Sequence, residues 1–290
     1  MKFDKNTKIL IVGLGLIGGS YAKALSDEGY FVGAIDKKKS SVEYALKNGL
    51  IQVGETSVKK DFVKDFDLIV FALYPHDFIN WIKEYQSSIK SGALITDVTG
   101  VKSFVVENVQ KILRGDLEFV GAHPMAGKEV SVVEIADPKI FVGANYIVTP
   151  TKRNTDENVQ AVKDLGRALG FERISSLSPE EHDETVGFLS HLTHCIAVSL
   201  MVSKKSHHLA EYTGDSFRDL TRIAKINDEM WSELFLANKD ELLKQMDLFE
   251  EKFNQLKEDI KNDNREKIRE TLRESTARRK VFDKDAKETK

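Results

Sequence analysis

The sequence predicts an α/β protein with a doubly wound parallel sheet, followed by an all-α domain. Lys8 to Val12 form a short apolar run that ends in glycines, with Gly13, Gly15 and Gly18 spaced as G-x-G-x-x-G. That order is typical of a buried strand followed by the first helix of a Rossmann-type fold. Further apolar runs alternate with helical patterns up to residue 177, and only helical patterns follow. The alternation favours parallel strands joined by helices.

Length and composition agree with two globular domains. A chain of 290 residues with 41% hydrophobic residues is long enough to form two cores. We expect a dinucleotide-binding domain over residues 1–177 and a helical domain over residues 178–290. The formal charge of −3 argues against a general binder of nucleic acid or of membrane surfaces, since such proteins usually carry a strong basic excess.

Cysteine content and the N-terminal segment indicate the compartment. Cys195 is the single cysteine, which excludes an internal disulfide and favours a reducing compartment. Its apolar neighbours indicate a small buried residue and not a nucleophile. The sequence begins with a polar segment that lacks a signal-peptide core, and it contains no uninterrupted apolar run of about 18 residues or more. We therefore expect a cytoplasmic protein that does not span a membrane.

The glycine pattern also predicts where a dinucleotide binds. Gly13 suits a tight turn, Gly15 allows close approach of a pyrophosphate, and Gly18 allows close helix packing. The free N–H groups at the start of the new helix would face the phosphates. We therefore expect cofactor contacts from Gly13, Gly15, Leu16, Ile17 and Gly18. A glycine-rich turn in an unrelated α/β protein is the alternative interpretation.

An acidic residue at the end of the next strand predicts which dinucleotide is bound. The apolar run from Tyr30 to Ile35 ends in Asp36, where ribose hydroxyls are recognised in this fold. A carboxylate there accepts hydrogen bonds from both hydroxyls and repels a 2′-phosphate, so we expect NAD. Lys37 to Lys39 would favour NADP, but these side chains can point to solvent.

Two later strands are expected to end at the same edge of the sheet. Leu68 to Leu73 and Ala93 to Thr96 are apolar runs of strand length. Because parallel strands present their carboxyl ends at one edge, Leu73, Pro75 and Thr99 are further candidates for cofactor contact. For Pro75 a simple strand stop is the alternative.

His123 is the candidate catalytic residue. The run from Phe119 to Ala122 predicts a strand that places His123 at the carboxyl edge, in a loop shaped by Pro124 and Gly127. A histidine held in that position suits proton transfer. The alternative is a structural histidine whose hydrogen bonds are satisfied locally.

Two helix starts are predicted after the first set of strands. Asn154 with Glu157 resembles a capping box that opens a helix. Ser178, Pro179 and Glu181 form a stronger signal, with serine as N-cap, proline at the first helical position and glutamate closing the box. The boundary between the domains is therefore expected just before Ser178.

Two histidines interrupt an apolar helix of the second domain. Val186 to Met201 is apolar almost all round, which predicts a helix buried at the centre of its domain. His191 and His194 are three residues apart and share one face. No third ligand joins them in an obvious motif, so we expect no metal. As buried polar groups, they either bond within the core or face a cavity.

A basic pair follows in the second domain. Arg218 and Arg222 are four residues apart and would share a helical face, which suits an anionic ligand, while Asp219 could hold one of them. The alternative is a pair of ordinary surface arginines.

An apolar seam near the C-terminus predicts lengthwise helix packing. Its members recur at steps of four and three residues: Leu242, Met246, Phe249, Phe253, Leu256 and Ile260. Such a seam packs on a partner helix. A homodimer through the helical domain is one interpretation, and an intramolecular pair with Ile268 to Leu272 is the other.

Taken together, several blocks of the sequence resemble the prephenate dehydrogenase family. The resemblance covers nearly the whole chain, from about Lys8 to Arg279, and the joint occurrence of three blocks is far more specific than the glycine motif. The blocks are GLGLIGGS, TDVTGVK at 96–102, GAHPMAG at 121–127, SHLTH at 190–194, and DLTRIAK at 219–225 with Trp231.

The resemblance implies an activity and roles for residues. The family converts prephenate to 4-hydroxyphenylpyruvate and CO2 on the route to tyrosine, with a nicotinamide cofactor and a dimeric helical domain. It implies that His123 takes the proton of the substrate's ring hydroxyl. For this histidine we expect an ordinary pKa of about 6.5. The resemblance places His194 in the substrate pocket and Arg222 on a substrate carboxylate. The further substrate candidates are Arg218, His191 and Thr99.

One position departs from the family pattern, and three rival functions stay open. Many relatives carry a serine that forms a hydrogen bond with the catalytic histidine where this chain has Gly100, so Thr99 or a water is left as the partner of His123.

The three rival functions are an arogenate dehydrogenase, another two-domain reductase, and a cofactor-sensing regulator without turnover. Such reductases would be expected to use a lysine or an acid where this chain has histidines.

Overall fold

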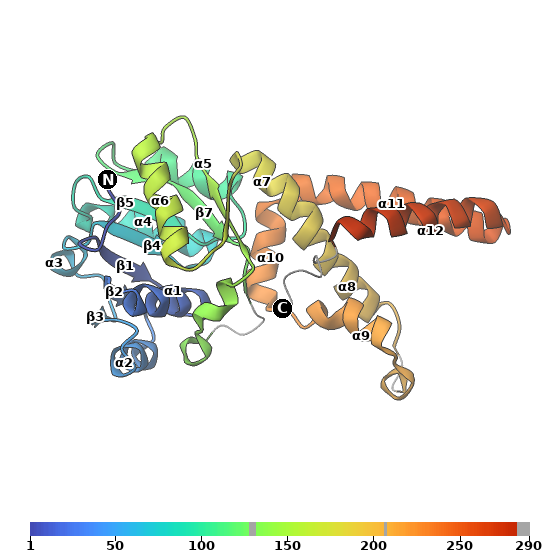
Figure 1. Cartoon of the computed structure of the whole chain (residues 1–290), viewed down its shortest axis with the longest axis horizontal. Helices are drawn as coiled ribbons and strands as arrows, with labels where there is room; N and C mark the ends of the chain where they lie inside the picture. Colours follow the sequence, from blue (N-terminus) through green and yellow to red (C-terminus); the bar gives the residue numbers. More distant parts are fainter. Residues whose placement is uncertain (128–131, 206–207, 283–290) are drawn as a thin grey trace. The chain divides into compact units, whose positions relative to one another are not determined.

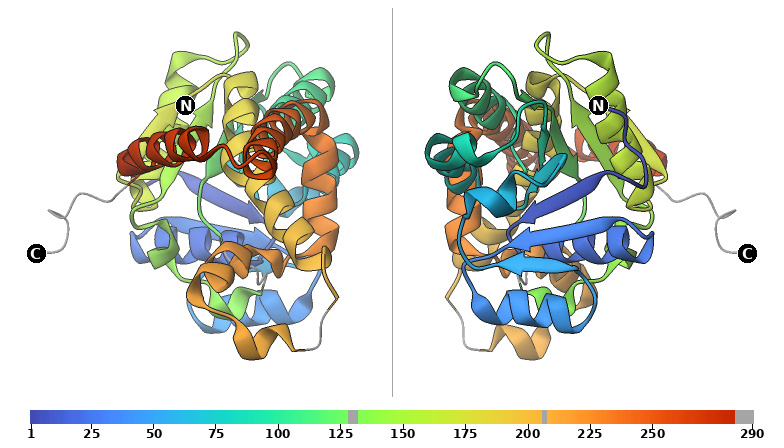
Figure 2. Two further views of the ribbon diagram at one scale, coloured as in Figure 1. Left: turned by 90° about the vertical axis from the view of Figure 1, so that its right-hand side faces the viewer. Right: turned by 90° about the vertical axis from the view of Figure 1, so that its left-hand side faces the viewer.

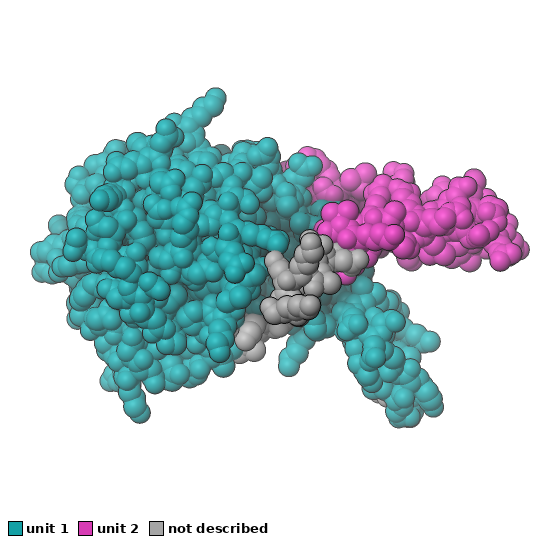
Figure 3. Space-filling view, in the orientation of Figure 1, with its two compact units in different colours: residues 1–239 teal, residues 240–290 magenta. Residues whose placement is uncertain are grey.

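The structure, a computed structural model, describes residues 1–127, 132–205 and 208–282. By its internal contacts the chain forms two compact units, Met1–Lys239 and Asp240–Lys290, which are coloured separately in Figure 3. The first unit holds both sheets and every residue named above as a site candidate. The predicted boundary after residue 177 therefore falls inside the first unit.

A six-stranded parallel sheet forms the first half of unit 1 (Figure 1). Its strand order is β3-β2-β1-β4-β5-β6, which reverses direction at β1 as in a doubly wound fold. The strands read as continuous apolar runs because both faces of the sheet are covered. They are β1 Lys8–Val12, β2 Phe31–Ile35, β3 Val53–Glu55, β4 Leu68–Phe71, β5 Leu94–Asp97 and β6 Glu118–Phe119.

Helices cover both faces of this sheet (Figure 2). On one face α1 and α2 pack against Ile9 and Ile11 of β1, and on the other face α4 and α5 pack against Leu10 and Val12. The alternation of side chains along a strand explains this division. The helices are α1 Leu16–Asp27, α2 Lys39–Lys47, α3 Lys60–Val63, α4 Pro75–Tyr85 and α5 Ser103–Ile112, with a 3₁₀ turn, η1, at Gln86–Ser88.

The predicted strand from Phe119 to Ala122 is divided between two sheets, which corrects the expectation of a single strand. Phe119 ends β6 of the parallel sheet, while β7, Gly121–Pro124, pairs antiparallel with β8, Asn145–Thr149, in a separate sheet. β9, Arg173–Ser176, adds to β8 in parallel. His123 therefore lies within β7, opposite Ile147, and not in a loop beyond the strand.

Of the two predicted helix starts, one is corrected and one is confirmed. α6, Asp156–Ala168, is capped by Thr155, whose side chain accepts the N–H of Asn158, so the capping box predicted at Asn154 is wrong. Asn154 instead accepts the N–H of Thr151 in the preceding turn. The second box is present as predicted: Ser178 and Glu181 cap α7, Pro179–Val186, reciprocally.

The long apolar helix of the second half is less buried than predicted. α7 continues through a π-helical segment, η4 Gly187–Leu192, into α8, Thr193–Val202, where only Ala197 is buried. Phe188 is 55% exposed and Val202 is 74% exposed. Within this one chain, the expectation of a helix buried at the centre of its domain is therefore wrong.

The same helix meets a membrane-span criterion by length and composition. From Pro179 to Val202 it is one continuous helical stretch with a mean hydropathy of 1.5 in its most apolar window. A core helix of a soluble protein passes the same test, so this is weak evidence for a membrane.

Short helices complete unit 1, and a helical pair forms unit 2. Unit 1 adds η2 Val133–Ile135, η3 Pro138–Phe141, η5 Leu209–Tyr212, α9 Asp215–Thr221, η6 Arg222–Ala224 and α10 Asp228–Ala237. Next come α11 Lys239–Lys261, α12 Arg265–Arg279 and η7 Lys280–Phe282.

The predicted apolar seam lies along α11. Phe253 is 59% exposed and Ile260 is 58% exposed. Leu272 of α12, a candidate for covering the seam, is itself 58% exposed. The contacts within the described chain therefore leave much of the seam uncovered.

Candidate active site

The glycine turn after β1 has the shape that a dinucleotide requires. Gly13 has φ +99°, and a Cβ there would lie 2.4 Å from the carbonyl oxygen of Ala72. A Cβ on Gly18 would lie 1.9 Å from the carbonyl oxygen of Gly13, so α1 approaches the turn too closely for any larger residue. Gly15 is the N-cap of α1. The N–H groups of the first helical turn lack intrahelical partners and suit a pyrophosphate.

Asp36 is fixed beside this turn. Its Oδ2 accepts the N–H of Leu14 at 2.6 Å, and its Oδ1 accepts the N–H of Lys38 at 2.7 Å. The carboxylate therefore stands at the end of β2 with a defined orientation, where it suits ribose hydroxyls. Leu16 is buried in the core and Ile17 is half-buried, so Leu16 is able to contact a cofactor through its backbone.

The loop after β4 completes this edge. The Cδ2 atom of Leu73 lies 3.0 Å from the position of a Gly13 Cβ, which places this predicted cofactor residue at the glycine turn. Pro75 is buried and starts α4. The start of α4 is tied to α10, since Glu233 Oε1 accepts the His76 N–H at 2.7 Å. These residues together fit a dinucleotide.

A buried ion pair follows β5. Lys102 Nζ donates to Asp97 Oδ2 at 2.6 Å, and both side chains are fully buried. Burial lowers the pKa of Lys102, and the Asp97 carboxylate opposes that shift. Asp97 Oδ1 accepts the N–H of Ala122 at 3.1 Å. The ion pair therefore links β5 of the parallel sheet to β7, beside His123.

Thr99 belongs to this buried pair. Its hydroxyl contacts Asp97 and the carbonyl oxygen of Val101, and it accepts from Lys102 Nζ at 3.0 Å. It is 4% exposed. Thr99 is therefore engaged with the ion pair and is not the partner of His123. As a cofactor or substrate contact it stays a prediction.

His123 has a partner that the sequence did not indicate. His123 Nδ1 lies 2.8 Å from His182 Nε2, and His182 Nδ1 lies 2.7 Å from Asp183 Oδ1. The two carboxylate oxygens of Asp183 accept the N–H groups of Lys102 and Ser103 at 2.8 and 2.7 Å. The one available signal was an adjacent His-Asp pair within the capped helix α7.

The charges of His123, His182 and Asp183 follow from their burial and their hydrogen bonds. Burial, followed by the influence of His182 and Lys102, holds the pKa of His123 well below its ordinary value, so the expected value of about 6.5 is wrong. Burial also lowers the pKa of His182. Burial alone would raise the pKa of Asp183, but the His182 hydrogen bond and two backbone N–H groups outweigh it and lower that pKa. Near neutral pH, two neutral imidazoles therefore stand beside one carboxylate.

His191 and His194 lie in an aromatic cluster with α10. His194 stacks on Trp231 with ring centroids 3.7 Å apart, and its Nδ1 lies 2.8 Å from the carbonyl oxygen of Ser190. His191 is 1% exposed, and its Nδ1 lies 3.3 Å from Asn238 Nδ2. Burial lowers the pKa of His191 to about 4. His191 is thus a neutral core residue, whereas His194 is partly exposed.

The two arginines do not share one helix. α9 ends at Thr221, and Arg222 starts the 3₁₀ turn η6. Arg218 is exposed and pairs with Asp215 at 3.2 Å. η6 packs against α8, the helix that carries His194. A cavity of about 590 Å³ opens between α8, α9 and η6, and its lining includes Arg218.

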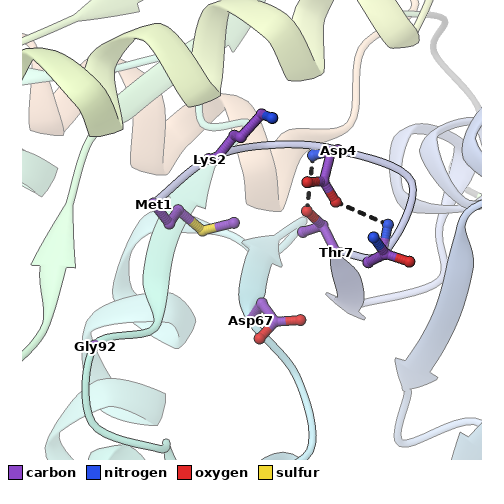
Figure 4. A pocket seen from close by; sticks show the side chains of 7 residues that line it. Met1, Lys2, Asp4, Thr7, Asp67 and Gly92 are labelled. Carbon is purple, nitrogen blue, oxygen red and sulfur yellow. Dashed lines mark hydrogen bonds between the residues drawn. The ribbon is translucent and has the colours of Figure 1, made fainter.

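A second cavity lies away from this site. A cavity of about 270 Å³ is lined by residues such as Thr7, Asp67 and Gly92 (Figure 4). These residues precede β1, β4 and β5, so the cavity lies at the amino ends of the strands, opposite the edge where this fold binds ligands.

Among the described residues, no group of three His, Cys, Asp or Glu side chains is placed to hold a metal ion.

Known proteins share both halves of this arrangement. Residues 21–173 match the model of the prephenate dehydrogenase nucleotide-binding domain, and residues 178–274 match that of the prephenate dehydrogenase dimerization domain. Prephenate dehydrogenase of Bacillus subtilis is 34% identical over 249 residues, 82% of this chain and 66% of the relative. The chain thus spans just under two thirds of that relative.

Two further relatives match over nearly their full length. Cyclohexadienyl dehydrogenase of Zymomonas mobilis is 29% identical over 287 residues, 96% of each chain. Among solved structures, prephenate dehydrogenase from Aquifex aeolicus, in complex with hydroxyphenyl propionate and NAD⁺, is 34% identical. It superposes with a TM-score of 0.87 over 96% of this chain and 98% of that one.

Proposed function

Since this chain belongs to the prephenate dehydrogenase family, we propose that it catalyses the NAD-dependent oxidative decarboxylation of prephenate to 4-hydroxyphenylpyruvate and CO2. The observation that carries the proposal is His123, a neutral, partly exposed imidazole beside the loop that follows β5. That loop belongs to the cofactor edge of the sheet. A base in that position can act on a substrate held against the cofactor.

The proposed chemistry assigns one proton transfer to the protein. A bound NAD⁺, held by the glycine turn and Asp36, would supply the hydride acceptor for the ring carbon that carries the hydroxyl. His123 accepts the hydroxyl proton, so that negative charge builds on the oxygen and assists the departure of hydride from the same carbon. The electrons of the breaking bond to CO2 remain in the ring, which becomes an aromatic phenolate. Near neutral pH this phenolate takes up a proton from water to give the phenol of 4-hydroxyphenylpyruvate, and His123 returns its proton to water. The chain's other residues hold the substrate in place and keep His123 neutral.

The choice of NAD over NADP rests on Asp36. Its carboxylate is fixed by two backbone N–H groups, so it offers hydrogen-bond acceptors to ribose hydroxyls and would repel a 2′-phosphate. Lys39, one of the three basic residues that follow, lies near Glu43 at 3.5 Å. That pairing reduces its availability to a phosphate.

The helical half supplies the candidates for substrate binding. Prephenate is a dianion, so its pocket needs cations and hydrogen-bond donors. We assign Arg222 to a substrate carboxylate and His194 to the same pocket, because η6 packs against α8. Arogenate differs by an amine in place of the keto group and is the second candidate substrate. We also place the enzyme in the cytoplasm, in keeping with its single cysteine.

The substrate and cofactor are tested by one set of assays. Purified protein with prephenate and NAD should produce NADH, and the rate should exceed those with prephenate and NADP or with arogenate and NAD. A higher catalytic efficiency with arogenate would move the assignment to that substrate. Equal efficiency with NADP would show that Asp36 does not select the cofactor.

His123→Asn should lower turnover by roughly 10²- to 10⁴-fold, because asparagine keeps the size but cannot accept the proton. Binding of NAD, measured by calorimetry, should persist. In the wild type, activity should rise with pH as His123 loses its proton. Since the pKa of His123 is held well below its ordinary value, the midpoint of this rise should lie well below the ordinary histidine pKa of about 6.5. Retention of most of the turnover in His123→Asn would make the residue structural.

Arg222→Ala should raise the KM for prephenate while the affinity for NAD stays nearly constant, because the guanidinium is assigned to the substrate alone. Arg222→Lys should fail to restore binding, since an ammonium group does not reproduce the planar fork. Steady-state kinetics would measure both variants. Wild-type substrate affinity in Arg222→Ala would exclude the assignment.

A homodimer through the helical half should be the species in solution. Apolar side chains are exposed along α8 and, in the second unit, along α11, where a second copy can cover them, and the matching domain model is one of dimerisation. Sedimentation at micromolar concentration should give twice the mass of one chain. In Phe253→Glu the measured mass should fall toward that of a single chain. A fully active wild-type monomer would refute this proposal.

A further inference from the structure

We infer that His182 and Asp183 are positioning residues that fix the proton of His123 on Nδ1 and so reserve Nε2 as the base. This inference rests on the proposed function for its catalytic meaning, but the proton positions are a property of the protein alone. Neither residue need touch the substrate, since His182 is fully buried and Asp183 is 2% exposed.

The proton positions follow from the order of the hydrogen bonds. An ionised carboxylate only accepts, so His182 must donate from Nδ1 to Asp183 Oδ1, 2.7 Å away. A neutral His182 then has a lone pair on Nε2, and His123 must donate to it from Nδ1 across 2.8 Å. The remaining nitrogen of His123, Nε2, therefore carries a lone pair and can accept a proton from a ligand.

Asp183 is itself held in one orientation. Its Oδ1 and Oδ2 accept the N–H groups of Lys102 and Ser103 at the N-terminus of α5, where a helix favours a negative charge. Its own backbone carbonyl accepts from Asn238 Nδ2 at 2.9 Å. The two bonds from Lys102 and Ser103 satisfy the carboxylate and keep it ionised in a buried place, whereas the Asn238 bond fixes only the backbone of Asp183. Because the carboxylate is ionised, the direction of the hydrogen bonds from His123 through His182 to Asp183 is definite.

The charged groups around the pair favour this arrangement. Lys102 faces it from the β5–α5 loop and is neutralised by Asp97, and His191 faces it as a neutral ring. When His123 takes up a proton, Asp183 stabilises the resulting cation through the His182 ring. Asp183 also raises the affinity of that ring for a proton. The same logic holds a catalytic histidine in serine hydrolases, where an aspartate sets its tautomer.

A purely structural role is the competing explanation, because His182 also fills buried space between α7 and β7. The two roles differ in what a replacement must supply. Glutamine can place an oxygen where His182 Nε2 lies and so accept the His123 proton, whereas leucine has a similar volume and no acceptor. A packing role would be satisfied by leucine at least as well as by glutamine.

The kinetic experiment compares these variants. His182→Leu should lower kcat by about 10²-fold or more, His182→Gln by about tenfold or less, and both should leave the Kd of NAD within about twofold of wild type. His208→Leu, at an exposed position on the surface, is the matched control and should be unchanged. Equal losses in His182→Leu and His182→Gln would overturn the inference.

The pH profile adds a readout that packing does not move. Asp183→Asn removes a negative charge that favours protonation of the two rings, so the rise of kcat/KM with pH should shift to lower pH while its plateau falls. An unshifted rise with a lowered plateau would count against a role for Asp183 in setting the base.

The proton positions can be measured without turnover. Histidine side chains labelled with ¹⁵N should show His123 and His182 in the Nδ1–H form in the substrate-free wild type, with signals assigned through His123→Asn and His182→Gln. A proton on Nε2 of His123 would overturn the inference even if the enzyme oxidises prephenate. Conversely, the expected tautomers in a protein without that activity would reject the proposed function and leave the inference intact, so the two failures are distinguishable.

Discussion

The buried ion pair between Asp97 and Lys102 is the interaction on which the site depends. Its carboxylate ends β5 and binds the backbone of β7, so the two sheets of unit 1 are held together next to His123. Removing one member of such a pair would leave a buried charge uncompensated, typically at a loss of about 3–5 kcal/mol of stability. A pair this costly to disturb gives a defined place to the strand that carries the base.

Burial of charge also explains how one site holds a neutral base and an anion side by side. The desolvation that keeps His123 and His182 unprotonated would also protonate an isolated carboxylate. Asp183 stays ionised because α5 offers two N–H donors and His182 a third. The base is thus kept neutral by what surrounds it, while the anion is kept charged by hydrogen bonds. The fold supplies both conditions at the point where α5, α7 and β7 meet.

The apolar side chains left exposed on the helices after residue 178 have a physical reason of their own. Phe188, Val202 and Phe253 are each more than half exposed in the single chain, so apolar area remains in contact with water. We propose that a second copy of the chain buries this area. The same composition gives the Pro179–Val202 helix its membrane-like hydropathy. A helix meant for an interface between two chains has the composition of a core helix, because it becomes one on assembly.

The sequence by itself determined the features that follow local rules. The glycine turn, the acid at the end of β2 and the capping box at Ser178 depend on neighbours within a few residues, so composition and spacing were enough. Tertiary structure alone decided the partner of His123, because His182 lies 59 residues away and meets it only when α7 packs on β7. It also decided the division of the 119–122 run, since local β-propensity does not say which sheet a strand joins. The exposure of α8 was decided in the same way: hydropathy tells which side chains must be buried, but only packing tells whether their own chain buries them.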